Sequence, residues 1–444
     1  MNSYKSSLDY VFRLGGKINV PAKYGLEKIE SLLDLINNPQ DRLRHIHIAG
    51  TKGKGSTTRL ISSILQASKY KVGMYISPSL VNISERISIN GELIPPKKFL
   101  EYVKFLSNIY NQISKEDIPS TFETFTIIAF KYFYESEVDF SVLEVGLGGR
   151  LDATNVIRNP LVSIITEISY DHQKILGGNL SQIASEKAGI IKTGLPVIIG
   201  TRELESKGEI LKVAKERSAP YYCLGDDFDF EIKEESPLGT IFDFYSKRFK
   251  VNFRDLRISL LGKHQVSNAS LAIQALLLLK KAGIDISDEI IYQGVRNTFW
   301  PGRLEVIKET PLVVLDGAHN GSSAKVLSES IGLFGRNVVL LFSMLSDKNV
   351  EDTLFYLSQV AEKIVITEVP NSFGRKLEAN VIYEKARHFF RKGNIEVIRD
   401  PREAYFKSLG VLNKTELLCV TGSLYLVGFV REIEKIFTFS NNVI

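Results

Sequence analysis

Residues 45–68 place a strand, a glycine-rich loop and a helix in immediate succession, and this constrains the fold more than any other feature of the sequence. His45–Ala49 is a short β-rich segment that stops at a glycine. A helix is predicted over Thr57–Ser68, because four apolar residues share one helical face: Leu60, Ile61, Ile64 and Leu65. The loop between them reads AGTKGKGST, residues 49–57. This order is typical of an α/β fold whose loop binds phosphate.

The three glycines of this loop allow tight turns and let backbone N–H groups face a phosphate. The helix amino terminus adds a favourable dipole, and Lys54 would neutralise charge on terminal phosphates. The loop is not a regular Walker A motif, because Ile48 occupies the first glycine position and Gly55 follows Lys54 in place of Ser or Thr. The alternative is a glycine-rich turn with an exposed lysine.

The same alternation of strand and helix continues along the chain. Near-continuous apolar segments predict strands buried on both faces, as in parallel sheets: Phe140–Val145, Val162–Ile165, Leu312–Leu315, Val338–Phe342, Ile364–Thr367 and Leu417–Val420. A Pro-Gly pair within Asn297–Leu304 marks a break. We therefore expect an α/β fold: a large P-loop-type domain (residues 1–297) with a mostly parallel sheet covered by helices on both faces, and a smaller Rossmann-like α/β C-terminal domain (298–444). Residues 223–258 predict antiparallel strands appended to the parallel sheet.

Composition excludes several classes of protein. The net charge of +5 over 444 residues is too dilute for a nucleic-acid surface, which needs clustered basic residues. Two cysteines, Cys223 and Cys419, rule out a disulfide framework and are expected in apolar surroundings. The amino-terminal sequence MNSYKSSLDYVFRLGG lacks an apolar signal segment, and no stretch is long and apolar enough for a membrane span. We expect a cytoplasmic protein.

Two further motifs contain candidate catalytic groups. Glu144 ends an apolar strand and begins the sequence EVGLGGRLD, so its carboxylate is placed to bind Mg²⁺; the alternative is an ordinary loop glutamate. His172 follows the strand Val162–Ile165 within the sequence SYDH, although a lone histidine is more often structural. Lys187 lies on a probable helix, where a solvated lysine is the plain expectation.

Three residues nearer the carboxyl terminus complete the candidate set. Asn268 precedes a helix predicted over Ser270–Lys280 and either caps it or contacts a purine edge. Arg303, at the break between domains, is placed to reach a phosphate, and Asp316 ends a strand where it can accept from a ribose hydroxyl. The alternative for both is a hinge salt bridge or a turn cap.

Together these motifs resemble the folylpolyglutamate synthase/dihydrofolate synthase family, of the wider Mur ligase superfamily. The resemblance covers nearly the whole chain. It is carried, in order, by GTKGKGST, Ser77-Pro78, Glu85-Arg86-Ile87, EVGLGGRLDATN, SYDH, EKAGIIK, GKHQVSNA, WPGRLE, LDGAHN and VTGSLY. It implies that residues 1–297 form an ATP-binding, Mur-ligase-like central domain and residues 298–444 a Mur-ligase-like C-terminal domain.

The resemblance also implies roles for single residues. ATP-binding positions would be Gly50, Thr51, Gly53, Lys54, Gly55, Ser56, Thr57, Asn268, Arg303, Asp316 and His319. Magnesium ligands would be Ser77, Glu144 and His172, and catalytic residues Lys54, His172 and Lys187. Lys187 matches a lysine that is often carbamylated, which would turn a cation into an oxygen ligand for a second Mg²⁺. Phe122 and Glu123 match a segment near the pterin-bearing substrate.

The implied activity is ATP-dependent addition of L-glutamate, through an acyl phosphate, to the carboxylate of a reduced folate and also of dihydropteroate. A monomer is expected, with small-molecule substrates only. Departures from the family pattern occur at Lys52, Gly321, Ser343–Lys348 and Lys174–Asn179, and they bear on substrate preference. Two alternatives are a P-loop NTPase or kinase without a glutamate step, and a non-catalytic nucleotide-binding relative.

Overall fold

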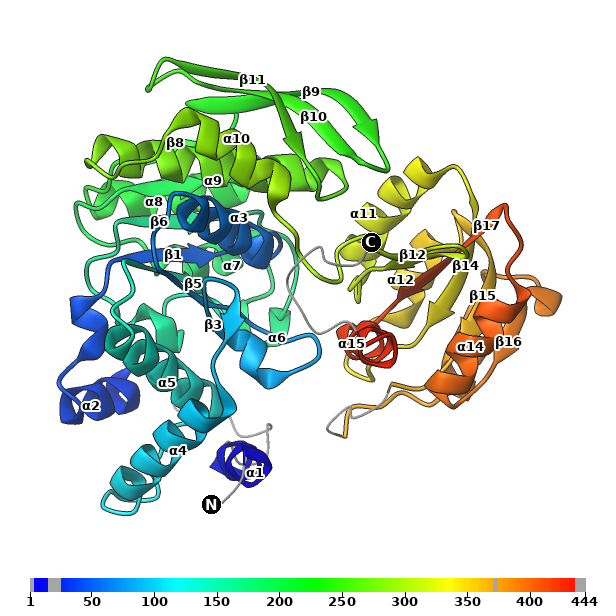
Figure 1. Cartoon of the computed structure of the whole chain (residues 1–444), viewed down its shortest axis with the longest axis horizontal. Coiled ribbons are helices and arrows are strands. Elements are labelled where there is room, and N and C mark those ends of the chain that lie inside the picture. The colour runs from blue at the N-terminus through cyan, green and yellow to red at the C-terminus, as the bar shows by residue number, and fades with distance from the viewer. Residues whose placement is uncertain (1–3, 15–24, 370–373, 436–444) are drawn as a thin grey trace.

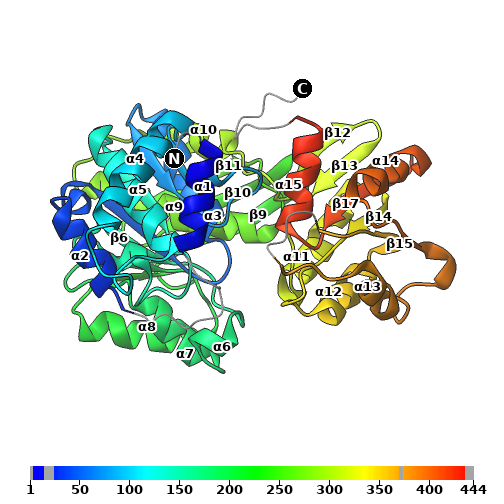
Figure 2. The same cartoon turned by 90° about the horizontal axis from the view of Figure 1, so that it is seen from below.

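The computed structural model describes residues 4–14, 25–369 and 374–435, which form two α/β lobes (Figure 1). The larger lobe contains the elements from α1 to α10, and the smaller lobe contains those from β12 to α15. A view at right angles shows the same two lobes side by side (Figure 2). The segment Thr298–Leu304, between α10 and β12, connects them.

Eight strands form the sheet of the larger lobe, in the order β4-β3-β2-β5-β1-β6-β7-β8. They are β1 (His45–Ala49), β2 (Val72–Tyr75), β3 (Ile87–Ile89), β4 (Glu92–Leu93), β5 (Phe140–Glu144), β6 (Val162–Ile165), β7 (Val197–Ile199) and β8 (Tyr221–Cys223). The strands from β2 to β8 in this order run parallel, whereas β3 and β4 add antiparallel pairs at one edge.

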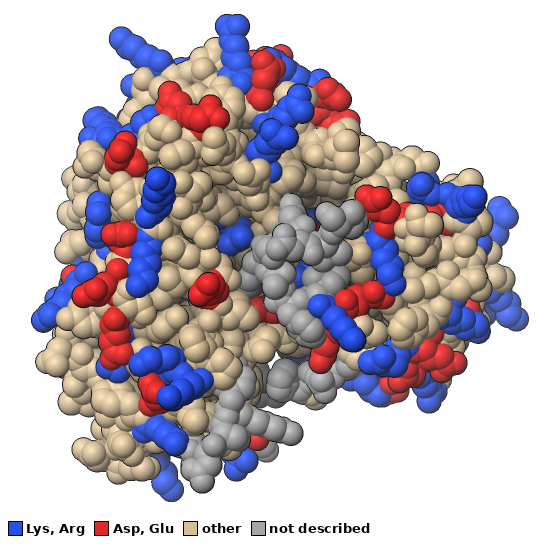
Figure 3. All heavy atoms as spheres, in the orientation of Figure 1, with Lys and Arg blue, Asp and Glu red and all other residues tan. Residues whose placement is uncertain are grey.

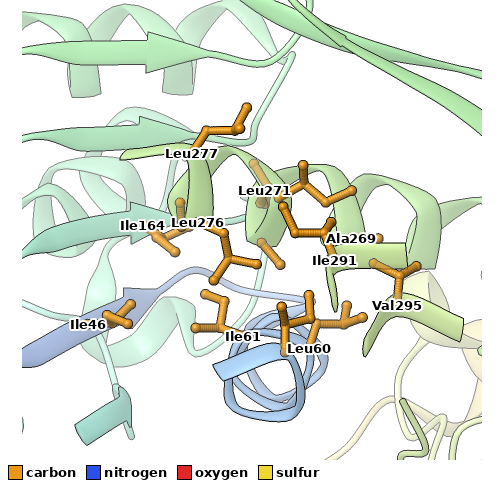
Figure 4. Packing of buried hydrophobic residues seen from close by; sticks show 14 of the residues in the cluster. Ile46, Leu60, Ile61, Ile164, Ala269, Leu271, Leu276, Leu277, Ile291 and Val295 are labelled. Atoms are coloured by element: carbon orange, nitrogen blue, oxygen red, sulfur yellow. The ribbon is translucent and has the colours of Figure 1, made fainter. Parts of the chain in front are cut away.

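Helices cover both faces of this sheet, because its strands bury alternate side chains on opposite sides. Ile46 and Ile164 pack with α3, α9 and α10 on one face (Figure 4). Ala49 and Ile165 pack with α7 and α8 on the other face, where α2, α4 and α5 bury a third cluster. The helices are α1 (Tyr4–Leu14), α2 (Glu27–Leu35), α3 (Lys54–Ala67), α4 (Pro96–Tyr110), α5 (Thr121–Glu135), α6 (Gln173–Leu176), α7 (Leu180–Ala188), α8 (Leu204–Glu216), α9 (Lys263–Lys281) and α10 (Asp288–Asn297).

A separate antiparallel sheet packs against α9 and α10. Its strands are β9 (Phe228–Ser236), β10 (Gly239–Ser246) and β11 (Val251–Ile258). The antiparallel pairing was predicted, but the expectation that these strands extend the parallel sheet was wrong. Only an isolated bridge between Leu224 and Phe228 links the end of β8 to the start of β9.

The smaller lobe has six strands in the order β12-β13-β17-β14-β15-β16. They are β12 (Glu305–Glu309), β13 (Leu312–Leu315), β14 (Asn337–Phe342), β15 (Ala361–Ile366), β16 (Ile395–Val397) and β17 (Glu416–Thr421). All pairs are parallel except β12 with β13. Helices α11 (Gly321–Ile331), α12 (Val350–Leu357) and α13 (Ala379–Ala386) cover one face, and α14 (Pro401–Val411) and α15 (Leu424–Ile433) the other.

Five 3₁₀ helices complete the described elements: η1 (Pro39–Arg42), η2 (Ile83–Arg86), η3 (Ala153–Val156), η4 (Gly332–Phe334) and η5 (Lys392–Asn394). Cys223 and Cys419 are free and buried, as predicted. Acidic and basic side chains are interspersed over both lobes on the face shown in Figure 3. Among the described residues, every helix is too short or too polar to cross a membrane.

Candidate active site

The glycine-rich loop lies at the carboxyl end of β1 and leads directly into α3. The helix begins at Lys54, three residues earlier than predicted, so Lys54 and Gly55 belong to its first turn. Gly53 precedes the helix with φ of 84°, a left-handed conformation that favours glycine. A Cβ at Gly53 would lie 2.2 Å from Oδ1 of Asn268, so this glycine also allows α9 to approach the loop.

A cavity of about 300 Å³ opens beside this loop. It is lined by Gly50, Thr51, Lys54, Val145, Gly146, Leu147, Gly148, Asp171, His172, Leu176 and Lys187. Four segments therefore meet in one place: the phosphate loop, the loop after β5, the segment after β6, and the carboxyl end of α7. All three predicted catalytic residues, Lys54, His172 and Lys187, line it.

Lys187 is buried, with 4% of its surface exposed, so the plain expectation of a solvated lysine was wrong. Its Nζ donates to the carbonyl oxygen of Gly50 at 2.8 Å. Burial, together with the nearby charge of Lys54, lowers the pKa of Lys187 to about 7. At neutral pH, the Lys187 side chain is therefore a neutral amine in a substantial fraction of the molecules.

The loop after β5 is held by a single carboxylate. Oδ2 of Asp152 accepts hydrogen bonds from the backbone N–H groups of Gly146 and Leu147, both at 2.9 Å. Its Oδ1 accepts from the N–H and the hydroxyl of Thr154 at 3.0 and 2.5 Å. These four bonds keep Gly146 and Leu147 at the cavity wall, so Asp152 shapes the cavity without lining it.

Glu144, at the end of β5, is buried behind the cavity. Burial raises the pKa of its carboxyl group to about 7, while Lys54, the Ser77 N–H and Arg303 act in the opposite direction. The Ser77 N–H donates to its Oε2 at 3.2 Å, which places the two residues side by side. A buried carboxylate beside a serine hydroxyl is an oxygen donor set that suits Mg²⁺, because a cation offsets the cost of burying the anion.

His172 is more exposed than the other two predicted metal ligands, with 46% of its side chain accessible. Burial lowers its pKa, Lys54 and Lys187 contribute in the same direction, and Asp171 opposes them. Lys54 is thus close enough to act electrostatically on both Glu144 and His172. The described residues hold no cluster of three or more His, Cys, Asp and Glu side chains. A site built from Ser77, Glu144 and His172 is compatible with this, because only two of its members are of those types.

Arg303, Asp316 and His319 lie on the side of the smaller lobe. Asp316 accepts from the backbone N–H groups of Leu304 and Ala318 at 3.0 and 2.8 Å, so it fixes the turn that carries Arg303. Nδ1 of His319 donates to the carbonyl oxygen of Gly317 at 2.8 Å. None of the three lines the cavity. Arg303 and Asp171 both act electrostatically on His319, which shows that the two lobes face each other here.

The segment between the lobes contacts the phosphate loop through Trp300, the single tryptophan of the chain. A Cβ at Gly55 would lie 3.1 Å from the indole Cζ2 and 3.4 Å from Oε2 of Glu144. Arg59, on α3, donates to the carbonyl oxygen of Phe299 at 3.1 Å. This close approach leaves little room for a side chain at Gly55, the position at which a regular Walker A motif has Ser or Thr.

The remaining predicted residues lie around the cavity without lining it. Phe122 packs against Gly146, where a Cβ would lie 2.4 Å from its ring. The carboxylate of Glu123 accepts from the N–H of Ser120 at 2.7 Å and forms a capping box at the start of α5. Asn268 lies inside α9, which begins at Lys263, so the alternative that it caps this helix was wrong.

Two family models match the sequence: the Mur ligase middle domain over residues 48–276, and the Mur ligase glutamate ligase domain over residues 302–424. The sequence is 35% identical over 423 residues to dihydrofolate synthase/folylpolyglutamate synthase of Bacillus subtilis (strain 168), an alignment that covers 94% of this chain and 96% of that relative. The chain belongs to the folylpolyglutamate synthase/dihydrofolate synthase family of Mur ligases. The resemblance inferred from its motifs is confirmed.

Solved structures of this family have the same fold. Folylpolyglutamate synthase from Thermotoga maritima is 36% identical, with a TM-score of 0.84 and coverage of 97% of this chain and 96% of that chain. Folylpolyglutamate synthase of Mycobacterium tuberculosis, complexed with ADP, gives a TM-score of 0.87 at 29% identity, over 97% of this chain and 98% of that chain. The predicted α/β fold class is confirmed, and this chain is an enzyme of the ligase class.

Several residues of this family member shape the site although they were not singled out for it. Asp171, Gly146 and Gly148 line the cavity, and Asp152 anchors its wall. For Gly146, Gly148 and Asp152 the signal in the sequence was the segment of three glycines and an aspartate after Glu144, whereas Asp171 stands next to His172 in SYDH. The glycines alone are equally consistent with ordinary loop punctuation, so the sequence did not distinguish the two.

Proposed function

We propose that this enzyme uses ATP to add L-glutamate to the carboxylate of a reduced folate, and that it also accepts dihydropteroate. The observation that carries this proposal is the cavity in which Lys54 of the phosphate loop meets Lys187 and His172 beside the buried carboxylate of Glu144. Its relatives are named as synthases of dihydrofolate and of folylpolyglutamate, which are the products of these two reactions. The glutamate ligase domain matched over residues 302–424 favours this activity over a P-loop NTPase or a kinase.

The chemistry requires activation of a carboxylate, because oxide is not a leaving group in water. Transfer of the γ-phosphoryl group of ATP to the carboxylate gives an acyl phosphate and ADP. The amine of L-glutamate then attacks the carbonyl carbon, phosphate leaves, and the amine loses a proton as the amide forms. The first step brings anions together, so it needs positioned cations. Lys54 and Arg303 supply two of them from opposite lobes.

Magnesium would be held by Ser77, Glu144 and His172, and when bound it would neutralise phosphate charge. The neutral amine of Lys187 is the form that reacts with carbon dioxide, giving a carbamate and a proton. We propose that this carbamate provides an oxygen ligand for a second Mg²⁺. The lowered pKa of Lys187 favours this modification, because an ammonium group has no electron pair to donate.

Nucleotide binding is proposed to span both lobes. Backbone N–H groups of residues 50–57 would face the phosphates at the start of α3. Asn268, which touches the loop at Gly53, would contact the base, while Arg303, Asp316 and His319 would approach from the smaller lobe. In this account residues 1–297 and 298–444 are two domains that close over the acyl phosphate and exclude water.

The acceptor is proposed to enter past Phe122, which packs on the cavity wall at Gly146. Glu123 would act there through the position of α5, because its carboxylate is engaged in the capping box. We further propose a cytoplasmic monomer whose partners are small molecules: ATP, L-glutamate and the pteroyl acceptor.

The test is ADP release by the purified protein with Mg²⁺ and L-glutamate, run in parallel with 7,8-dihydropteroate and with tetrahydrofolate. Glutamate-dependent turnover with both acceptors supports a bifunctional synthase, and turnover with one supports a dedicated enzyme. Equal ADP release with and without glutamate supports the NTPase alternative. ATP binding without turnover supports the non-catalytic alternative and contradicts the proposal.

A further inference from the structure

Arg86 carries a charged side chain that the chemistry above does not use. It is the last residue of η2, and its carbonyl oxygen accepts from the N–H of Ile76, next to Ser77. Its guanidinium group lies over the ring of Phe125, 5.4 Å from the centroid. The Nε of Arg86 is buried and has no hydrogen-bond partner.

No carboxylate among the described residues forms an ion pair with Arg86, unlike the buried Arg431, which pairs with Glu305. Burial lowers the pKa of the Arg86 guanidinium below its ordinary value, while Tyr75, Tyr425 and Glu144 act in the opposite direction. A charge taken from water without a paired anion is costly for a folded protein. A ring contact recovers only a small part of this cost, because a cation–π contact is weak compared with an ion pair to a carboxylate.

A second arginine approaches the same region from the smaller lobe. Nη2 of Arg375 donates to the hydroxyl of Tyr425 at 3.0 Å, and the Nε of Arg375 is likewise buried without a hydrogen-bond partner. Tyr425 is the second residue of α15, a helix of the smaller lobe that lies on the side toward the larger lobe in both views (Figures 1 and 2). Tyr425 thus acts electrostatically on Arg86 of one lobe and bonds to Arg375 of the other.

We propose that Arg86 binds a carboxylate of the pteroyl acceptor, with Arg375 as a second contact from the opposite lobe. This inference rests on the proposed function, because it assumes that a pteroyl acceptor enters past Phe122, whose ring lies 5.9 Å from that of Tyr75. A guanidinium group is matched in shape and charge to a carboxylate. The rings of Phe125 and Tyr75 are fully buried and lie on the core side of Arg86, so they support the guanidinium group from behind and do not contact the ligand.

The test compares Arg86→Gln and Arg86→Lys with the wild-type enzyme by steady-state ADP release, varying the acceptor, ATP and L-glutamate in turn. We expect Arg86→Gln to raise KM for the acceptor on the order of 10- to 100-fold, the loss for a hydrogen bond to a charged group, with little change in KM for ATP. Arg86→Lys keeps the charge but not the planar guanidinium group, so its KM for the acceptor should lie between those of wild type and Arg86→Gln. Arg375→Gln should also raise KM for the acceptor, but by less than Arg86→Gln.

The matched control is Arg44→Gln. Arg44 also lies over a phenylalanine ring, that of Phe140 at 4.4 Å, but it is exposed and remote from the cavity residues. This variant should leave KM for the acceptor unchanged. Thermal unfolding of each variant separates binding from structure, because a purely structural Arg86 would lower Tm without a selective change in KM.

Comparing tetrahydrofolate with dihydropteroate shows which carboxylate of the acceptor Arg86 binds. Tetrahydrofolate has a glutamate with a reacting carboxylate and a second one, whereas dihydropteroate has only the carboxylate that reacts. A raised KM for both acceptors assigns Arg86 to the reacting carboxylate, and a raised KM for tetrahydrofolate alone assigns it to the second. If the wild-type enzyme uses only one acceptor, a raised KM for that acceptor in Arg86→Gln supports the proposal. An unchanged acceptor KM, or a change confined to ATP or L-glutamate, overturns the proposal. Failure of the proposed function itself would show separately, as absence of glutamate-dependent turnover in wild type.

Discussion

Lys54 and Lys187 donate hydrogen bonds to the same atom, the carbonyl oxygen of Gly50, at 3.1 and 2.8 Å. Lys187 is the buried member of the pair, and its pKa of about 7 reflects first its burial and then the charge of Lys54. The two ammonium groups therefore do not share this oxygen at full charge. The charge of Lys54 in the phosphate loop therefore adds to the effect of burial on the protonation of Lys187, which links nucleotide chemistry to any reaction of the Lys187 amine.

Replacement of Lys54 by Met should reduce ADP release roughly 100- to 1000-fold, because it removes a cation positioned at the cavity. It should also raise the pKa of Lys187, since one of the two causes that lower it is gone. The shift is measured by the pH dependence of Lys187 acetylation, quantified by mass spectrometry. Lys98→Met, at an exposed lysine of α4, is the control and should change neither quantity. Wild-type turnover in Lys54→Met would refute the role of this lysine.

Replacement of Glu144 by Gln should abolish Mg²⁺-dependent turnover while the fold is retained. The amide oxygen still accepts from the Ser77 N–H, but it carries no charge to hold a divalent cation. Stability should be equal or higher, because the variant no longer buries an ionisable carboxyl group whose pKa is raised to about 7. Turnover is followed across a Mg²⁺ titration and stability by urea unfolding. An unaltered Mg²⁺ dependence would remove Glu144 from the metal site.

The contact between the lobes depends on Gly428 of α15. A Cβ there would lie 2.1 Å from the carbonyl oxygen of Leu80, in the loop that follows Ser77. Gly428→Ala should therefore lower stability by roughly 1–3 kcal/mol and reduce turnover, because it displaces this loop. Gly208→Ala, in α8 where nothing lies within 4 Å, should instead stabilise by about 1 kcal/mol. Equal Tm values for the two variants would contradict this prediction, because they would show that the loop at Leu80 moves without loss of stability.

The sequence predicted the long apolar strands well, because burial on both faces leaves a continuous apolar segment. Strands β1, β6 and β13 have the predicted bounds, and β15 begins three residues earlier, at Ala361. The two-residue β4 and three-residue β3 are too short for periodicity to detect, and they form because β2 offers a free edge.

The site was predicted less completely, because its key relationships are contacts between distant segments. No pattern within α7 shows that Lys187 is the residue that reaches Gly50, 137 positions away. The role of Asp152 depends on how the loop after β5 closes, which the glycines permit but do not specify. Asn268 was placed before a helix because Gly262, the residue that precedes α9, provides no side-chain cap, so the true start of the helix at Lys263 has no recognisable signal.

Acid should destabilise the enzyme through His45, which β1 buries in the neutral form. Its Nε2 donates to the carbonyl oxygen of Gln40 at 2.7 Å, so Nδ1 accepts from the hydroxyl of Ser141 at 2.6 Å. Burial lowers the pKa of His45 to about 4, from an ordinary value of 6.5, and the Gln40 bond only partly opposes this. Between these values the unfolded chain binds more protons, so stability is lost as pH falls from 6.5 to 4, by on the order of 3 kcal/mol.

His45→Gln tests this directly, because glutamine can keep both hydrogen bonds and does not titrate. Urea unfolding at pH 7 and at pH 5 should show a smaller loss of stability for His45→Gln than for wild type. His388→Gln, at an exposed histidine, should keep the wild-type difference between the two pH values. The buried His47, whose pKa is also lowered by burial, remains in every variant, so some acid sensitivity should persist. If His45→Gln and wild type lose the same stability on acidification, the proton-linked cost lies elsewhere in the core.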